Sequence, residues 1–156
     1  ILFHAGHTLE NRHGEPFKEA KTGAKPKLDA QGQPTGFADE DMRILKHGNI
    51  ATMALDGPVP SDETLAKEDP AKWVKMVARR EEAAQIIAEA MKDEHADGWV
   101  DLSNDQKDLT VERLAQFATK LSNSMVGPVL YALEHPPKVR PQPAAHVNGA
   151  IAEAKA

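Results

Sequence analysis

Hydrophobic positions at helical spacing mark the clearest element of the chain, a helix predicted over Pro70–Glu94. Its apolar stripe advances in steps of three, four and seven residues and comprises Trp73, Val77, Ala84, Ile87 and Met91. The opposite face carries charged side chains, which we expect to be solvated or to meet a partner protein: Lys75, Arg79, Arg80, Glu82, Glu89 and Lys92. Asp69 and Pro70 suit the N-cap and the first helical position.

A second stripe predicts a long helix that starts at Thr110 and ends before Pro136-Pro137. This stripe comprises Leu114, Ala118, Leu121, Met125 and Val129. Thr110 is expected to be the N-cap, and Gly127-Pro128 to kink or split the helix, because proline lacks the backbone donor and crowds the preceding turn. Ser103 and Gln106 have the spacing of a capping box, which predicts a short helix before Leu109.

Two shorter helices are predicted before Pro70. Acidic residues just after Ala38 favour a helix start there, because they lie at the positive end of the helix dipole, and Gly48 suits a left-handed C-cap. The apolar run Ile50–Leu55 is expected to extend this helix or to form a short buried segment. Ser61 begins a further short helix, which ends at Asp69.

Residues outside this helical region lack regular hydrophobic spacing. Gly and Pro recur too often in the first 36 residues for a helix or a long strand, and Pro and Ala dominate the end of the chain. We therefore expect an all-α fold, a small bundle of about three main helices with extended, irregular arms at both ends. The expected division is an N-terminal arm at residues 1–37, a helical body at 38–135 and a Pro/Ala-rich tail at 136–156. The start at Ile1 instead of Met is expected of a processed product, a fragment or a chain whose first residues are missing.

The composition fits one domain and excludes several kinds of site. The chain has 156 residues, 28% of them charged and 4% aromatic, with a net charge of −5. No block of Lys and Arg offers a track for phosphates, so nucleic acid is not expected as a partner. The absence of Cys excludes disulfides, thiolate nucleophiles and Cys-type zinc sites. No apolar stretch reaches the ~18 residues of a membrane span, so the chain is expected to be soluble or held within an assembly.

The N-terminal segment contains the most suggestive candidate site. His4, His7, Glu10 and His13 follow one another at intervals of three residues, and imidazole and carboxylate are ligands of zinc and other divalent ions. On an extended or 3-10 segment the four side chains could share one side, whereas on an α-helix they drift around the surface. The alternative is an exposed polar arm with scattered histidines. The order differs from the His-Glu-x-x-His motif of metalloproteases.

Trp99, Arg79 and Arg80 are the candidate partner-binding residues. Trp99 follows Gly98 in a predicted turn, where it is either a core anchor or a contact for another chain. Arg79 and Arg80 belong to the charged face of the Pro70–Glu94 helix. Neither a nucleophile with an adjacent base nor a glycine-rich phosphate loop is evident, so no catalytic residue and no cofactor is assigned.

These patterns favour a non-catalytic structural or assembly subunit of a large complex, such as a virion, an organellar assembly or a multi-subunit enzyme. Polar arms rich in Pro and Gly do not offset their own ordering entropy, so other protein subunits are expected to order them. One alternative is a helical adaptor that binds a single protein through the charged face of the Pro70–Glu94 helix or through the C-terminal tail. The other is a small metal-dependent enzyme that uses the N-terminal His/Glu cluster.

Overall fold

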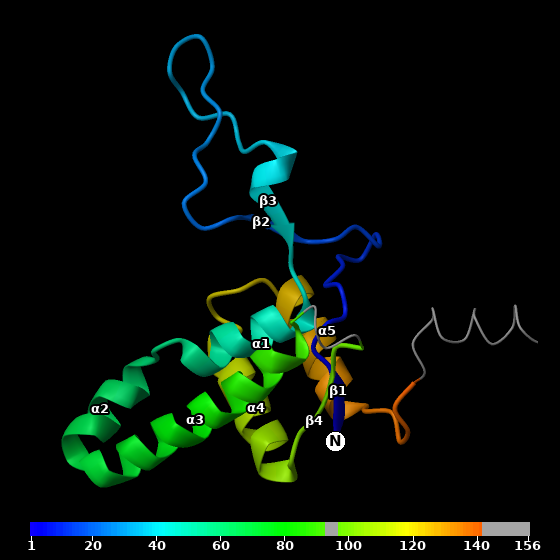
Figure 1. The fold of residues 1–156 in the computed structure, drawn as a ribbon. Helices are drawn as coiled ribbons and strands as arrows, with labels where there is room; N and C mark the ends of the chain where they lie inside the picture. The colour runs from blue at the N-terminus through cyan, green and yellow to red at the C-terminus, as the bar shows by residue number, and fades with distance from the viewer. Residues whose placement is uncertain (93–96, 142–156) are drawn as a thin grey trace, which may run out of the picture.

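The architecture combines a helical body with two small antiparallel sheets (Figure 1). A computed structural model describes residues 1–92 and 97–141. In these ranges the helices are α1 (His47–Asp56), α2 (Pro60–Glu68), α3 (Pro70–Ala90), α4 (Asn104–Phe117) and α5 (Asn123–Glu134). Strand β1 (Leu2–His4) pairs with β4 (Trp99–Asp101), and β2 (Lys18–Ala20) pairs with β3 (Met42–Ile44), which the 3-10 turn η1 (Asp39–Asp41) precedes. The expectation of an all-α bundle of about three helices is therefore wrong.

The first nine residues pack into the body, in contrast to the extended arm expected at the N-terminus. Pairing of β1 with β4 places Phe3 opposite Val100. Phe3, Ala5 and Leu9 are at most 1% exposed, so they belong to the core. The hydrophobic pattern missed this segment because a three-residue strand is too short to reveal the two-residue period, and its pairing strand lies far away in the chain.

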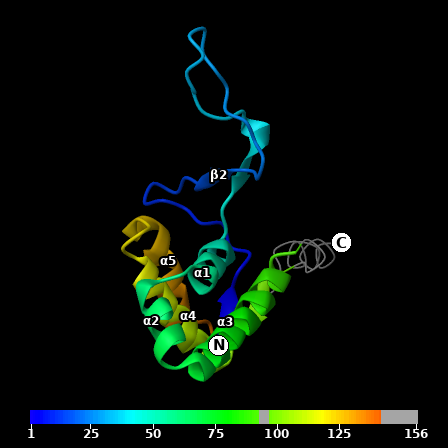
Figure 2. The ribbon, with the colours of Figure 1, turned by 90° about the vertical axis from the view of Figure 1, so that its left-hand side faces the viewer.

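Helix α1 lies at the centre of the body, where it packs against α3, α4 and α5. Figure 2 shows α1 between α5 and α3. Its buried face is made largely of small and branched apolar residues: Ile50, Ala51, Ala54 and Leu55. The buried face of α3 is also made of small and branched apolar residues: Ala83, Ala84, Ile87 and Ala90. Alanine side chains allow helix backbones to pack closely.

The prediction of a helix from Ala38 to Gly48 is wrong. η1 and β3 occupy most of that stretch, and α1 begins only at His47. The pairing of β3 with β2 involves residues distant in sequence, and it overrides the local helical signals. Gly48 lies in the first turn of α1, where a Cβ atom would sit 2.9 Å from the Cβ of Ala5 and 2.5 Å from the Sδ of Met91. Glycine therefore lets α1 approach the N-terminal segment, instead of ending a helix.

The predicted helix start at Asp69 and Pro70 is confirmed. The Asp69 side chain caps α3 by accepting a hydrogen bond from the Lys72 N–H at 3.2 Å, and Pro70 is the first helical residue. The apolar stripe is buried only in the second half of α3, since Val77 is 39% exposed. The reason is that the first turns of α3 pack against α2, in a hairpin that extends beyond the other helices (Figure 1).

Helices α4 and α5 replace the single long helix predicted from Thr110. The break lies at residues 118–122 and Pro128 is inside α5, so the split expected at Gly127-Pro128 is wrong. The Ser103 and Gln106 capping box is confirmed, but it starts a 14-residue helix instead of a short one. Thr110 is buried inside α4, where its hydroxyl donates to the Gln106 carbonyl at 2.7 Å, and it caps nothing. None of the helices that the structure describes is long and apolar enough to cross a membrane.

Candidate functional site

Residues 10–44 form an arm that leaves the helical body and returns to it (Figures 1 and 2). Leu9 and Leu45 are buried at its two ends, and no residue between them is buried. We call this segment the arm. A segment of this length without a fully buried residue is the surface of the described residues best placed to contact another molecule.

Local hydrogen bonds order the arm along its length. The Asn11 side chain accepts the backbone N–H groups of His13 and Glu15 at 2.8 and 3.0 Å, which closes the first turn. β2 and β3 pair in antiparallel register, and Arg43 and Glu19 add an ion pair across them. Aspartate and asparagine are suited to these turns because their short side chains bond the backbone two and four residues ahead.

Three residues fix the base of the arm to the body. The Leu9 N–H donates to the Leu45 carbonyl at 2.9 Å, the Leu45 N–H to the Phe17 carbonyl at 2.8 Å, and the Phe17 N–H to the Leu9 carbonyl at 2.9 Å. Leu9 and Leu45 are core residues, and Phe17 packs against the core. The arm is therefore held in a defined direction at its base.

The far end of the arm exposes an apolar side chain among lysines. We call residues 21–36 the arm tip. Leu28 is 62% exposed there, and Lys21, Lys25 and Lys27 are exposed with it. The tip turn is closed by Asp29, whose carboxylate accepts the N–H groups of Gln31 and Gln33 at 2.9 Å each. The arm tip thus presents one leucine and an excess of positive charge on a preformed turn.

A cluster of histidines lies in the body below the arm. The His4 ring stacks on the indole of Trp99, with 4.5 Å between centroids and 5° between planes. The His7 ring lies 5.4 Å from His4 and 4.8 Å from His47. Burial, followed by the charges of His7 and His4, lowers the pKa of His47 to about 4, and burial and His7 also lower the pKa of His4. Burial therefore favours the neutral rings of His4 and His47.

The structure separates the four residues of the predicted metal site. His4 and His7 lie in the body, whereas Glu10 and His13 lie in the arm. His47, which the sequence pattern did not indicate, is the third imidazole near His4 and His7. Among the described residues, no three His, Cys, Asp or Glu side chains are placed to hold a metal ion. The arrangement gives the predicted metal site no support.

The predicted partner-binding residues have three different environments. Trp99 is half-buried against His4, and its carbonyl accepts a hydrogen bond from Arg140 at 3.2 Å. Arg79 is exposed on α3. Arg80 is only 8% exposed, so the interpretation that it belongs to the charged outer face is wrong. Its position four residues before Ala84 and seven before Ile87, on the buried side of α3, is the signal in the sequence.

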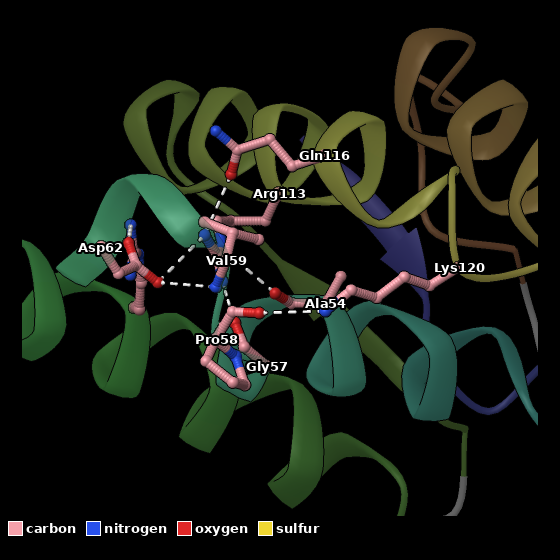
Figure 3. A network of polar contacts seen from close by, with 9 residues as sticks. Ala54, Gly57, Pro58, Val59, Asp62, Arg113, Gln116 and Lys120 are labelled. Carbon is pink, nitrogen blue, oxygen red and sulfur yellow. Dashed lines mark hydrogen bonds and ion pairs between the residues drawn. The ribbon is translucent and has the colours of Figure 1, made fainter. Parts of the chain in front are cut away.

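Arg113 of α4 is 1% exposed and ties α4 to the end of α1 (Figure 3). Its Nε donates to the Ala54 carbonyl at 3.1 Å, its Nη1 to the Gln116 side chain at 2.9 Å, and its Nη2 to the Gly57 carbonyl. These carbonyls belong to the last turn and C-cap of α1, where unpaired acceptors need donors. Arg113 therefore acts as a long-range cap of α1.

Asp62 of α2 supplies a negative charge to two arginines in this region. One carboxylate oxygen lies 2.9 Å from Nη2 of Arg80, and the other lies 3.6 Å from Nη1 of Arg113. Partial burial alone would raise the pKa of Asp62, but hydrogen bonds from Arg80 and the Val59 N–H and the two arginine charges hold it below its ordinary value. A single carboxylate thus links α2 to both α3 and α4.

A pocket of about 290 Å³ lies where the end of α1 faces α3. We call it the Trp73 pocket. Its walls are largely apolar, with contributions from Leu55, Pro58, Trp73 and Val77. A mostly apolar wall with a few polar groups is typical of a site that takes a small ligand or a side chain.

Polar groups of the Trp73 pocket lack partners. The indole Nε1 of Trp73 and the Nε of Arg80 are buried, and neither has a hydrogen-bond acceptor in the part of the chain that the structure describes. A buried donor left unpaired costs about 1–3 kcal/mol. At the pocket edge, partial burial and then the charge of Glu81 raise the pKa of Asp56. Asp56 and Glu81 thus place two acids at the edge of a largely apolar pocket.

Comparison with protein-family models, with curated proteins and with solved structures gives no match to this chain. The arm, the Trp73 pocket and the buried arginines are therefore interpreted from their own chemistry.

Sequence reasoning missed Arg113 as it missed Arg80, although Arg113 follows Leu109 by four residues and so lies on the apolar side of α4.

Proposed function

We propose that the protein is a non-catalytic subunit of a multi-protein assembly and that the arm binds a neighbouring subunit. The observation that supports this is the absence of any buried residue between Leu9 and Leu45 in an arm that its turns and strands nevertheless order. Fixing each backbone residue costs roughly 1–2 kcal/mol, and beyond the partly buried Phe17 at its base the arm packs no hydrophobic side chain on the core to offset this cost. A surface supplied by another subunit would provide that burial.

Cross-linking in the cells that produce the protein tests this function. A lysine-reactive cross-linker should join Lys21, Lys25 and Lys27 of the arm to the same protein in every preparation. Mass spectrometry identifies the linked peptides. Cross-links that come instead from Lys72 and Lys75 of α3 would support the helical adaptor. Arm lysines that form no cross-link to another chain would contradict the assembly function.

Excision of the arm provides a second test on the same chain. The Leu9 N–H and the Leu45 carbonyl are 2.9 Å apart, so a short Gly-Ser turn can join residue 9 to residue 45. The excised protein should keep the helical circular dichroism of the full chain, because α1 to α5 lie outside the arm. It should no longer co-purify with the assembly. Co-purification at the level of the full chain would show that the arm is dispensable for incorporation.

A further inference from the structure

The arm tip and the Trp73 pocket complement each other in apolar character and in charge. The tip exposes Leu28 beside lysines, and the pocket has an apolar wall with Asp56 and Glu81 at its edge. Residues 21–36 contain three lysines and one aspartate, and that aspartate, Asp29, is occupied in the tip turn. Among the described residues Asp56 and Glu81 form no ion pair, and Glu81 accepts a hydrogen bond from the Gln85 side chain at 3.2 Å. Both acids can therefore still meet a cation.

We propose that the arm tip of one copy of this chain docks in the Trp73 pocket of a second copy, with Leu28 in the pocket and Lys25 or Lys27 beside Asp56 and Glu81. This inference rests on the proposed function and names the neighbouring subunit.

The turn at the tip favours docking because it is already formed. The Lys27 N–H donates to the Gly36 carbonyl at 2.7 Å, and the Thr35 N–H donates to the Lys27 carbonyl at 2.8 Å. Gly32 and Gly36 have φ angles of 78° and 107°, a region that L side chains rarely adopt, so glycine closes this turn without strain. A side chain presented on an ordered turn loses less conformational entropy on binding than one on a flexible chain.

The tip cannot fill the pocket of its own chain in this fold. Figures 1 and 2 show the arm extending away from the body on the side opposite the α2–α3 hairpin, on which Trp73 and Val77 lie. The base of the arm is fixed in that direction by Leu9, Phe17 and Leu45. The occupant therefore comes from a second molecule, in a contact that pairs two different surfaces.

Mixing two variants of the full chain tests this contact. In Leu28→Asp the tip is disabled and the pocket is intact, whereas in Val77→Asp the pocket is disabled and the tip is intact. Both residues are exposed, so both variants should fold with unchanged circular dichroism. In sedimentation velocity the native chain should associate with rising concentration, and each variant alone should weaken that association roughly tenfold or more. An equimolar mixture should restore a one-to-one complex, because the intact tip of one variant meets the intact pocket of the other.

Matched substitutions outside the proposed contact serve as controls. Ile44→Asp lies on β3 near the arm base, and Val74→Asp lies on α3 outside the pocket lining; both residues are exposed, and both variants should associate like the native chain. Raised salt should weaken the native association, because lysines meet acids in the contact. A native chain that stays monomeric, or a mixture that fails to pair, overturns the inference. If arm lysines still cross-link to a different protein in cells, the assembly function stands without self-association; if they cross-link to none, both proposals fail.

Discussion

At the scale of single residues, buried charge decides how α1, α2 and α3 meet α4. Arg113 is 1% exposed, yet its donors reach the carbonyls of Ala54 and Gly57 and it lies beside Asp62. Burying a cation is unfavourable unless hydrogen bonds and a counter-charge accompany it, and here both are present. Arg80 shares the same counter-charge, so removal of one carboxylate leaves two guanidinium groups unpaired.

Asp62→Asn should therefore lower the free energy of unfolding at neutral pH by about 3 kcal/mol. Because the folded pKa of Asp62 lies below its unfolded value, this stability is present above about pH 4 and is lost as pH falls through the folded pKa. Urea denaturation near neutral pH measures the difference.

Asp56→Asn is the matched control for that substitution. Asp56 ends α1, where a negative charge opposes the helix dipole, and its pKa is raised by partial burial and by Glu81. Its neutralisation should leave the free energy of unfolding unchanged or raise it by up to about 1 kcal/mol. An equal decrease in the free energy of unfolding in the two variants would show that the contacts of Asp62 with Arg80 and Arg113 do not stabilise the fold.

At the scale of elements, α3 and α4 begin with side-chain caps, and the sequence predicted both starts. Ser103 accepts the Gln106 N–H at 3.1 Å, and Gln106 in turn accepts the Ser103 N–H at 2.9 Å, which together start α4. Ser122 precedes α5 at the same position, but its side chain makes no capping hydrogen bond. The two serines therefore differ in what they contribute to their helices.

Ser103→Ala should cost about 1 kcal/mol of unfolding free energy, because the Gln106 N–H loses its acceptor at the helix start. Ser122→Ala should change it by less than about 0.5 kcal/mol, since no cap is lost. Thermal unfolding followed by circular dichroism at 222 nm, where α-helices have a strong negative band, compares the two variants. A larger effect at Ser122 than at Ser103 would contradict the role assigned to the Ser103 cap.

At the scale of the whole molecule, the histidine cluster joins parts of the chain that are remote in sequence. His4 lies on β1, His7 lies just before the base of the arm, and His47 starts α1, while Trp99 of β4 covers His4. His47 is 7% exposed, and its N–H donates to the His7 carbonyl at 2.9 Å. Protonation there would place a charge in a buried site, beside two other imidazoles and at the positive end of α1.

Stability should consequently fall in mild acid. The unfolded pKa of His47 is near 6.5 and the folded pKa is about 4, so the neutral ring stabilises the fold above pH 6.5 and this contribution is lost as pH falls toward 4. The expected loss between about pH 7 and about pH 5 is roughly 2 kcal/mol, measured by urea denaturation. His47→Gln should flatten this dependence, whereas His13→Gln, in the exposed arm, should leave it unchanged. A pH dependence that survives in His47→Gln would exclude His47 as its source.

The sequence by itself determined the elements whose signals are local. Asp69-Pro70 and the Ser103 and Gln106 pair act within one helical turn, so the starts of α3 and α4 follow from neighbouring residues. The tertiary structure decided the rest: the β1–β4 and β2–β3 pairs, the start of α1 at His47, and the burial of Arg80 and Arg113. Each of these depends on hydrogen bonds or charges supplied by residues far away in the chain, and spacing along the sequence does not record such partners. Both levels contribute to the arm: Gly and Pro predicted irregular structure there, whereas the tertiary hydrogen bonds of Leu9, Phe17 and Leu45 fix its direction.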